Sequence, residues 1–458
     1  MLRKSSKSTT EKVISDEKKS IWGWAFYDWA NSAFATTVMA GFFPIFFKQY
    51  WSYGTDVNIS TAQLGFGNAA ASLIVALLAP VLGAIADRGS ARKKFLILFA
   101  YLGVLMTAGL FLVGKGQWAL AIIVYVMGII GFSGSIIFYD ALLPLVTTES
   151  RFDRVSSLGY AMGYLGGGLL FLLNVSMTLA PERFGLLDAA AAVRFSFVTV
   201  AAWWGGFTVL TIRWVQEEDT RPFAVGVRGA VVQGVQQLFG TFKEFRRLKT
   251  TFLFLAAYWF YIDGVDTIIR MAVDYGLSLG FQSTDLILAL LMVQFIGFPA
   301  ALGFGKLGQL FGVRRTIFLA IGFYILITGW GTIVTTKREF FILAAMIGLV
   351  QGGIQALSRS YYARLIPGNR TAEYFGFYNM LGKFAAIIGP ALMGVVGLAA
   401  KRCLMPPSPT AADLINISQM ASRWSIGSVA ILFLVGGLLL YFVDEKKGRA
   451  ESALLTNP

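Results

Sequence analysis

The sequence predicts an all-α polytopic membrane protein with twelve transmembrane helices in two six-helix bundles. Of its 458 residues, 56% are hydrophobic and only 14% are charged, whereas a soluble chain carries roughly 25% charged residues. The 50 glycines favour close contact between helices in lipid. This composition excludes an ordinary soluble enzyme, a disordered chain and a collagen-like chain.

Twelve apolar segments follow one another along the chain, and each is long enough to cross a bilayer. The first six lie at 22–49, 63–86, 95–113, 118–143, 156–180 and 195–214. The other six lie at 250–275, 285–305, 316–335, 340–364, 374–399 and 424–443. We therefore expect a tail at 1–21, an N-terminal bundle at 22–214, a linker at 215–249, a C-terminal bundle at 250–443 and a second tail at 444–458.

The distribution of Lys and Arg predicts the orientation of the chain. An even number of spans places both termini on one side, and the loops of that side carry three times as many basic residues as the opposite loops. Because basic loops stay in the cytoplasm, we expect cytoplasmic termini and residence in the cell (inner) membrane. The net charge of +14 then reflects orientation, and no nucleic-acid partner is expected.

The residue types that most enzymes use are missing from the sequence. Cys403 is the one cysteine and there is no histidine, which excludes internal disulfides, multi-cysteine metal clusters and histidine-based catalysis. No Walker motif supports ATP hydrolysis, so an ion gradient or the solute gradient would drive transport. We expect no catalytic residue, no metal and no cofactor.

The linker carries apolar residues at helical spacing, among them Val231, Val235, Leu238 and Phe242. This pattern predicts an amphipathic helix that lies on the cytoplasmic membrane surface. The alternative is a plain tether between the bundles.

Two loops repeat each other. Aligning GAIADRGSARKK at Gly83 with GKLGQLFGVRR at Gly305 places Arg92 opposite Arg314, whereas Asp87 faces Gln309. Internal repeats of this kind are typical of transporters whose halves rock about a central site. The alternative is a chance similarity between two basic loops.

The repeated loops resemble the signature loop of the major facilitator superfamily. More specific segments are similar to its vacuole-effluxer branch: YDWANSAFATTV (Tyr27–Val38), FYDALLP (Phe138–Pro144), YIDGVDTII (Tyr261–Ile269) and GGIQALSRS (Gly352–Ser360). The resemblance implies the major facilitator fold, alternating access and transport of amino acids, particularly neutral ones. One difference from this branch is Asp140, where Asn is expected.

The resemblance also assigns a role to the first of the two loops. In the superfamily, the acid and the basic cluster of this loop hold the two bundles together on the cytoplasmic side. Asp87, Arg88, Arg92 and Lys93 would do so here. Because Gln309 replaces the acid in the second copy, we expect a weaker contact there.

Seven charged residues inside the predicted spans are candidates for the site, because a charge at bilayer depth costs roughly 2.5–3.5 kcal/mol and should face a cavity or a partner. They are Asp28, Asp140, Asp263, Asp266, Arg270, Arg359 and Lys383. The resemblance places all but Lys383 on helices that line the central cavity.

Four of these charges lie towards the cytoplasmic ends of their helices. Asp28 and Asp140 in the first half, with Arg359 and Lys383 in the second, predict a cytoplasmic gate of opposite charges. The alternative is that they snorkel or cap helices and never pair.

Asp263, Asp266 and Arg270 share one helical face near the middle of the membrane. Asp266 and Arg270 can neutralise each other, which leaves Asp263 without a partner on its own helix. A buried, unpaired carboxylate suits a proton carrier, so Asp263 is the predicted carrier. The alternative is a hydrogen-bonded Asp263 that shapes a helix break at Gly264.

Uncharged polar side chains complete the predicted solute site. Gln351, Gln355 and Arg359 form a polar stripe on an otherwise apolar helix. The other predicted lining residues are Asn31, Tyr139 and Tyr261. An Arg opposite a carboxylate can hold the two ends of a zwitterion.

The sequence as a whole predicts a monomeric secondary transporter that moves a small polar solute across the bilayer and is coupled to protons. Gly159, Gly163 and Gly167, four residues apart, predict a tight helix crossing. Two other functions stay open: an exporter of lipids or amphipathic compounds, and a transporter-like receptor that binds its ligand without moving it. The direction of transport is not predicted.

Overall fold

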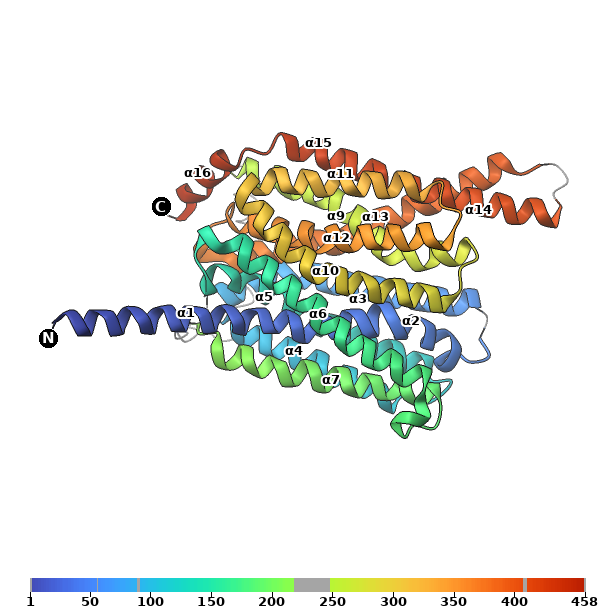
Figure 1. Ribbon diagram of the computed structural model, residues 1–458, viewed down its shortest axis with the longest axis horizontal. Helices are drawn as coiled ribbons and strands as arrows, with labels where there is room; N and C mark the ends of the chain where they lie inside the picture. Colours follow the sequence, from blue (N-terminus) through green and yellow to red (C-terminus); the bar gives the residue numbers. More distant parts are fainter. Residues whose placement is uncertain (1, 56, 89–90, 218–247, 407–409, 457–458) are drawn as a thin grey trace. The chain divides into compact units, whose positions relative to one another are not determined.

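The computed structural model describes residues 2–55, 57–88, 91–217, 248–406 and 410–456 (Figure 1). Within these residues, 12 helical stretches are long and apolar enough to cross a membrane. The predicted number of spans is confirmed. The amphipathic helix predicted for the linker falls in 218–247, outside the described residues.

The chain forms two compact units. Unit 1 consists of Met1–Lys243 and Ile366–Met380, and unit 2 consists of Glu244–Leu365 and Leu381–Pro458. The C-terminal bundle at 250–443 stays a prediction, and residues 366–380 of it belong to unit 1 by their contacts.

Unit 1 is built from the first six spans. Its helices are α1 (Leu2–Ala33), α2 (Phe43–Phe46), α3 (Val57–Arg88), α4 (Arg92–Gly109), α5 (Trp118–Val146), α6 (Phe152–Leu179) and α7 (Ala189–Trp214). Within it, α4 packs along α5, while α1 packs on α6 and α7. The expected tail at 1–21 is helical from Leu2 onward and continues directly into the first span.

The first span changes its helix type three times. Two π-helical segments, Phe34–Phe42 and Phe47–Trp51, flank the short α2. Pro44 lies in α2, and proline removes a backbone donor and clashes with the preceding turn. A wider turn before Pro44 relieves that clash, which accounts for the π-helical backbone.

Small residues allow α6 to lie directly against α1. A Cβ added to Gly159 would stand 2.8 Å from Cζ3 of Trp24, one on Gly163 would stand 2.6 Å from Ser32 Oγ, and one on Gly167 would stand 3.1 Å from the Ser32 carbonyl oxygen. The tight crossing predicted from the glycine spacing is confirmed.

Unit 2 is built from the remaining spans. Its helices are α9 (Lys249–Ser278), α10 (Ser283–Phe311), α11 (Val313–Gly331), α12 (Lys337–Ala363), the later part of α13 (Thr371–Leu404), α14 (Ala411–Ser428), α15 (Ala430–Tyr441) and α16 (Glu445–Thr456). Here α10 packs along α12, and α9 along α15. The last span, Asn416–Tyr441, joins α14 to α15.

The helix break considered at Gly264 is not present, because α9 runs without interruption through this residue. Gly264 serves packing instead. A Cβ at this position would lie 2.7 Å from Cζ of Phe433 on α15, so the glycine makes room for the aromatic ring.

The contact between α6 and α1 gives a test of the packing. Gly166→Ala would bring a Cβ to 2.6 Å from the Trp29 carbonyl oxygen, and overpacking of this kind costs about 1–3 kcal/mol. We expect a lower melting temperature of the purified protein, followed by size-exclusion fluorescence. Gly206→Ala, which meets no atom within 4 Å, is the matched control and should be neutral or stabilising; equal melting of both variants would contradict this packing.

Candidate functional site

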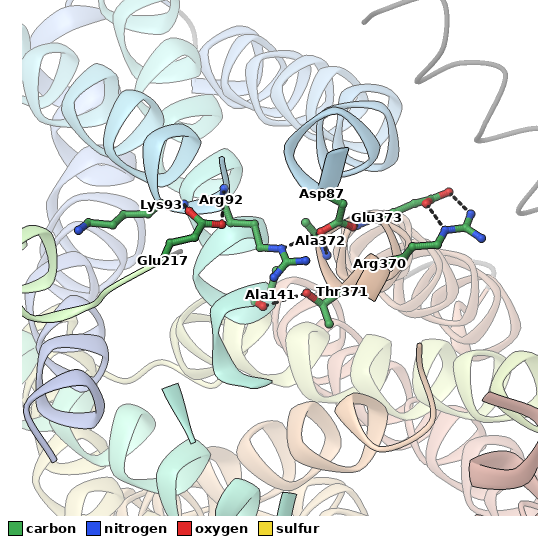
Figure 2. Close-up of polar contacts among 9 residues, drawn as sticks. All are labelled: Asp87, Arg92, Lys93, Ala141, Glu217, Arg370, Thr371, Ala372 and Glu373. Atoms are coloured by element: carbon green, nitrogen blue, oxygen red, sulfur yellow. Dashed lines mark hydrogen bonds and ion pairs between the residues drawn. The ribbon is translucent and has the colours of Figure 1, made fainter. Parts of the chain in front are cut away.

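The carboxylate of Asp87, at the end of α3, caps the first turn of α13. Its Oδ1 accepts the Ala372 N–H at 3.1 Å and its Oδ2 accepts the Glu373 N–H at 2.8 Å (Figure 2). Nearby, Thr371 donates its hydroxyl to the Ala141 carbonyl at 3.1 Å. A carboxylate at a helix N-terminus satisfies unpaired donors and meets the positive end of the helix dipole.

Two glycines make this approach possible. A Cβ on Gly83 would lie 2.2 Å from the Ala372 carbonyl oxygen, and one on Gly376 would lie 2.6 Å from the Ala79 carbonyl oxygen. The backbones of α3 and α13 therefore touch where each helix carries a glycine. The repeated loop begins at one of these two positions.

Arg92 links Asp87 to the start of α4. Its Nε donates to Asp87 Oδ1 at 2.7 Å, and both side chains are almost fully buried. Glu217, just after α7, accepts the backbone N–H groups of Arg92 and Lys93 at 3.1 Å and 2.9 Å. Asp87, Arg92, Glu217 and the α13 start thus form one connected set, which we call the capping network (Figure 2).

Burial raises the pKa of the Glu217 carboxyl above its ordinary value of 4.5. The backbone N–H groups of Lys93 and Arg92 and the charge of Arg92 act in the opposite direction, while the charge of Asp87 adds to the effect of burial. Desolvation is the largest of these causes. Burial therefore disfavours the ionised form of Glu217, and the hydrogen bonds from the two backbone amides stabilise it.

A basic residue of each repeated loop makes a similar contact, although the alignment pairs Lys93 with Arg315 and not with Arg314. In unit 1, Lys93 Nζ donates to the Val215 carbonyl at 2.7 Å; in unit 2, Arg314 donates to the Val443 carbonyl at 2.5 Å. Each bond joins the repeated loop to the chain just after the last span of its unit. Gln309, aligned with Asp87, is exposed.

A different carboxylate caps a helix in unit 2. Glu451 of α16 accepts the Thr250 N–H at 2.9 Å and the Thr250 hydroxyl at 3.2 Å. Thr250 stands at the start of α9, and Gly448 of α16 packs against its side chain. The C-terminal residues expected as a tail are thus helical and bound to α9.

Asp28 lies among aromatic rings in unit 1. It accepts the hydroxyl of Tyr139 at 2.8 Å, and the ring of Trp24 stacks on the Tyr139 ring at 4.3 Å between centroids. The Trp24 indole donates to the Tyr139 carbonyl at 2.8 Å. The structure thus brings together two predicted site residues, Asp28 and Tyr139.

Asp140 is also buried in unit 1. Its Oδ2 accepts the side-chain amide of Asn379 at 3.1 Å, which belongs to the α13 segment of that unit. The same amide donates to the Phe375 carbonyl at 3.0 Å. Asp140 and Asp87 therefore both bind the first turns of α13.

Asp263 is buried between α9 and α13 in unit 2. Both of its carboxylate oxygens accept the Gly389 N–H at 3.0 Å, and Thr267 donates its hydroxyl at 3.3 Å. The expectation that Asp263 lacks a partner on its own helix is wrong, because Thr267 lies one turn later. A Cβ on Gly389 would clash with both side chains, so only glycine allows this approach.

Lys383 belongs to the same part of unit 2. The Asp266 carboxylate interacts electrostatically with Arg270 on α9 and with Lys383 on α13. Asp266 and Lys383 are half-buried, and Arg270 is exposed. The structure thus places Lys383, which the sequence assigned to a gate with Arg359, beside Asp266 and Arg270.

The remaining predicted residues lie in three settings. Tyr261 and Ser358 share a hydrogen bond of 2.7 Å between α9 and α12, and the neighbouring Arg359 is 2% exposed. Gln351 and Gln355 are half-buried, and Asn31 is buried in unit 1. The side chain of Arg88 falls outside those that the structure describes.

Several functional residues escaped the sequence analysis. Glu217 and Asn379 bind partners more than 100 residues away, and nothing in the local sequence marks them. Gly389 did carry a signal, since it precedes Pro390 inside a span. A Gly-Pro pair interrupts the backbone ladder of a helix and marks a place where a side chain can bind the backbone.

Comparison with known proteins identifies relatives of the whole chain. A family model described as "Vacuole effluxer Atg22 like" matches residues 16–63 and 54–400. The uncharacterized MFS-type transporter YxiO of Bacillus subtilis (strain 168) is 38% identical over 425 residues, covering 92% of this chain and 94% of the relative. Autophagy-related protein 22 of Coccidioides immitis (strain RS) is 23% identical over 555 residues, covering 95% and 88%.

Solved structures share the fold. The human organic anion transporter MFSD10 (TETRAN) matches with a TM-score of 0.65 at 14% identity, covering 93% of this chain and 99% of the other. The proton:xylose symporter XylE bound to 6-bromo-6-deoxy-D-glucose matches with a TM-score of 0.65 at 13% identity, covering 98% and 100%. The predicted fold, that of the major facilitator superfamily, is confirmed.

Removing the cap of α13 should loosen its first turn. Asp87→Ala deletes the acceptor for the Ala372 and Glu373 amides, and loss of such a cap costs about 1 kcal/mol. We expect these two amides to exchange hydrogen roughly fivefold faster, as measured by mass spectrometry. Asp413→Ala, which removes the Thr410 cap on α14, is the control and should leave them unchanged. Equal exchange in Asp87→Ala and the wild type would refute the cap.

The raised pKa of Glu217 predicts a pH effect on stability. The folded protein holds this proton more tightly than the unfolded chain does, so the contribution of Glu217 to stability falls as pH rises from about 4.5 towards the raised pKa. We expect the melting temperature of the wild type, relative to Glu217→Gln, to decline over this interval. A difference that grows with pH would contradict the burial of Glu217.

Proposed function

Because this chain belongs to the Atg22-like vacuole effluxer family of MFS-type transporters, we propose that it moves a neutral amino acid by alternating access with coupling to protons. A membrane transporter of this fold handles a small molecule and sits in the bilayer. The solute, the coupling to protons, the monomeric state and a cell-membrane location with cytoplasmic termini are our proposals.

The observation that carries the proposal is the bonding of Asp263 inside a transmembrane span. Its carboxylate accepts an N–H from Gly389 and an O–H from Thr267. An ionised carboxylate only accepts hydrogen bonds, whereas a protonated one also carries a donor. Protonation therefore weakens the match with the donors of α13 and α9. A proton on Asp263 would loosen the contact between these two helices.

One helix carries both groups of contacts. The first turn of α13 is bound by Asp87 and its third turn by Asp140, both in unit 1, and Gly389, further along α13, is bound by Asp263 in unit 2. A change at Gly389 acts on the helix whose start is capped by Asp87. We infer that α13 transmits the protonation of Asp263 to the capping network.

Three charged residues of the predicted cytoplasmic gate, Asp28, Asp140 and Arg359, keep that role in our proposal. We propose that Asp28 and Asp140 close the cytoplasmic side together with Arg359, and that Asp87 and Arg92 stabilise this closed form through α13. A charge in the membrane is expensive unless it is paired, and buried charges on both halves suit a contact that forms and breaks during transport.

The test of the proposed function is flux through the purified protein. In proteoliposomes, a mixture of ¹⁴C-labelled neutral amino acids should accumulate when a pH gradient is applied and should not accumulate when the gradient is collapsed. A protein that binds the mixture without any flux would be a receptor. Flux that ignores the pH gradient would exclude coupling to protons.

Asp263→Asn tests the carrier directly. The amide cannot take up a proton, so gradient-driven accumulation should fall to the level of protein-free liposomes, while exchange of labelled for unlabelled solute should continue. Asp285→Asn makes the same chemical change at a residue that pairs with Lys337 and should leave accumulation unchanged. Full accumulation in Asp263→Asn would remove this residue from the coupling step.

A further inference from the structure

Four charged side chains lie together on α9 and α13 of unit 2. They are Asp263, Asp266, Arg270 and Lys383. Asp266 interacts electrostatically with Arg270 and Lys383, and Asp263 interacts more weakly with Asp266 and Arg270. All four fall within helical stretches long and apolar enough to span a membrane, where unbalanced charge attracts a counter-charge.

The two acids are bonded differently. Both oxygens of Asp263 are engaged by the Gly389 N–H, and one also by the Thr267 hydroxyl, so its environment is closed. Asp266 faces the two cations and is half-buried, as is Lys383, while Arg270 is exposed. Arg270 is therefore the most exposed side chain of the cluster.

The charge of the cluster changes when Asp263 takes up a proton. When both acids are ionised and both basic groups are charged, the acids balance Arg270 and Lys383. Protonation of Asp263 alone then leaves one positive charge in the cluster. A guanidinium and an ammonium around one carboxylate then offer donors that fit a second carboxylate.

Among the described side chains, the charges that act on Asp266 and Lys383 come from the cluster itself. α15 presents Phe433 at Gly264, and α12 presents Ser358 at Tyr261. The charged groups of the remaining neighbours lie elsewhere: Arg423 of α14 faces Tyr275, Glu451 of α16 caps Thr250, and Asp285 of α10 pairs with Lys337.

We propose that Arg270 and Lys383, with Asp266 between them, form a binding subsite for one carboxylate group of the solute, and that this group binds together with a proton on Asp263. The inference rests on the proposed transport function and adds the part of the solute that is recognised. Because binding sites that share an electrostatic field are linked reciprocally, the proton favours the carboxylate and the carboxylate favours the proton. The solute carboxylate and the proton on Asp263 together add no net charge to the cluster.

The test compares two sets of amino-acid derivatives as competitors of ¹⁴C amino-acid exchange in proteoliposomes. N-acetyl amino acids keep the carboxylate and lose the ammonium group, whereas amino-acid amides keep the ammonium group and lose the carboxylate. We expect the N-acetyl derivatives to compete and the amides to fail. For the wild type, competition should weaken from mildly acidic to mildly alkaline pH.

Four variants resolve the contributions. Arg270→Gln and Lys383→Gln should each raise the half-inhibitory concentration of the N-acetyl derivatives about tenfold, the size expected for one charged hydrogen bond. Asp266→Asn should lower it, and Asp263→Asn should remove its dependence on pH. Lys337→Gln, which deletes the same charge outside the cluster, should change nothing. If Arg270→Gln or Lys383→Gln fails to fold, the lower half-inhibitory concentration expected for Asp266→Asn still tests the subsite.

A second measurement separates this inference from the proposed function. The melting temperature of the purified protein should rise with N-acetyl derivatives and stay constant with amides, even if no flux occurs. Flux together with equal competition by both sets would overturn the subsite and leave the transporter intact. Unchanged competition in Arg270→Gln and Lys383→Gln, or no thermal shift with either set, would also overturn it.

Discussion

A charged or hydrogen-bonding group inside hydrocarbon needs a partner, because no water is there to solvate it. In this chain, carboxylates meet that need by binding backbone amides of one helix, α13. Asp87 accepts the amides of Ala372 and Glu373, and Asp263 accepts the amide of Gly389. Two acids therefore bind α13 at separate points along its length.

The same solution recurs at other helix ends. Glu217 caps α4, and Glu451 caps α9. Each acid comes from a segment that follows the last span of its unit, so the chain returns to fix the start of an earlier helix. Because four amides at a helix start lack partners, one carboxylate can hold two segments that are far apart in sequence. At α13, Gly83, Gly376 and Gly389 allow the close approach that the bonds of Asp87 and Asp263 require.

The number of spans was predictable, since length and apolar composition are local properties of the sequence. The importance of Asp87 and Arg92 followed from the resemblance of their loop to the superfamily's signature loop, and the crossing of α6 on α1 followed from glycine spacing. The bonds of Glu217 and Asn379 were not predictable, because partners more than 100 residues away leave no periodic signal. The charges that act on Lys383 were also not predictable, because Asp266 and Arg270 lie more than 100 residues earlier in the chain. From its position in the sequence, Lys383 was assigned to the cytoplasmic gate.

Asp263 is where the structure and the proposed mechanism meet, since its carboxylate holds α13 and is also the proposed proton carrier. Infrared difference spectroscopy of the protein in lipid, during a change of pH, observes such a carboxyl group directly. The account predicts a protonated-carboxyl band that disappears in Asp263→Asn and shifts in frequency in Thr267→Val, where one hydrogen-bond donor is lost. A carboxyl band that is identical in the wild type and both variants would contradict it.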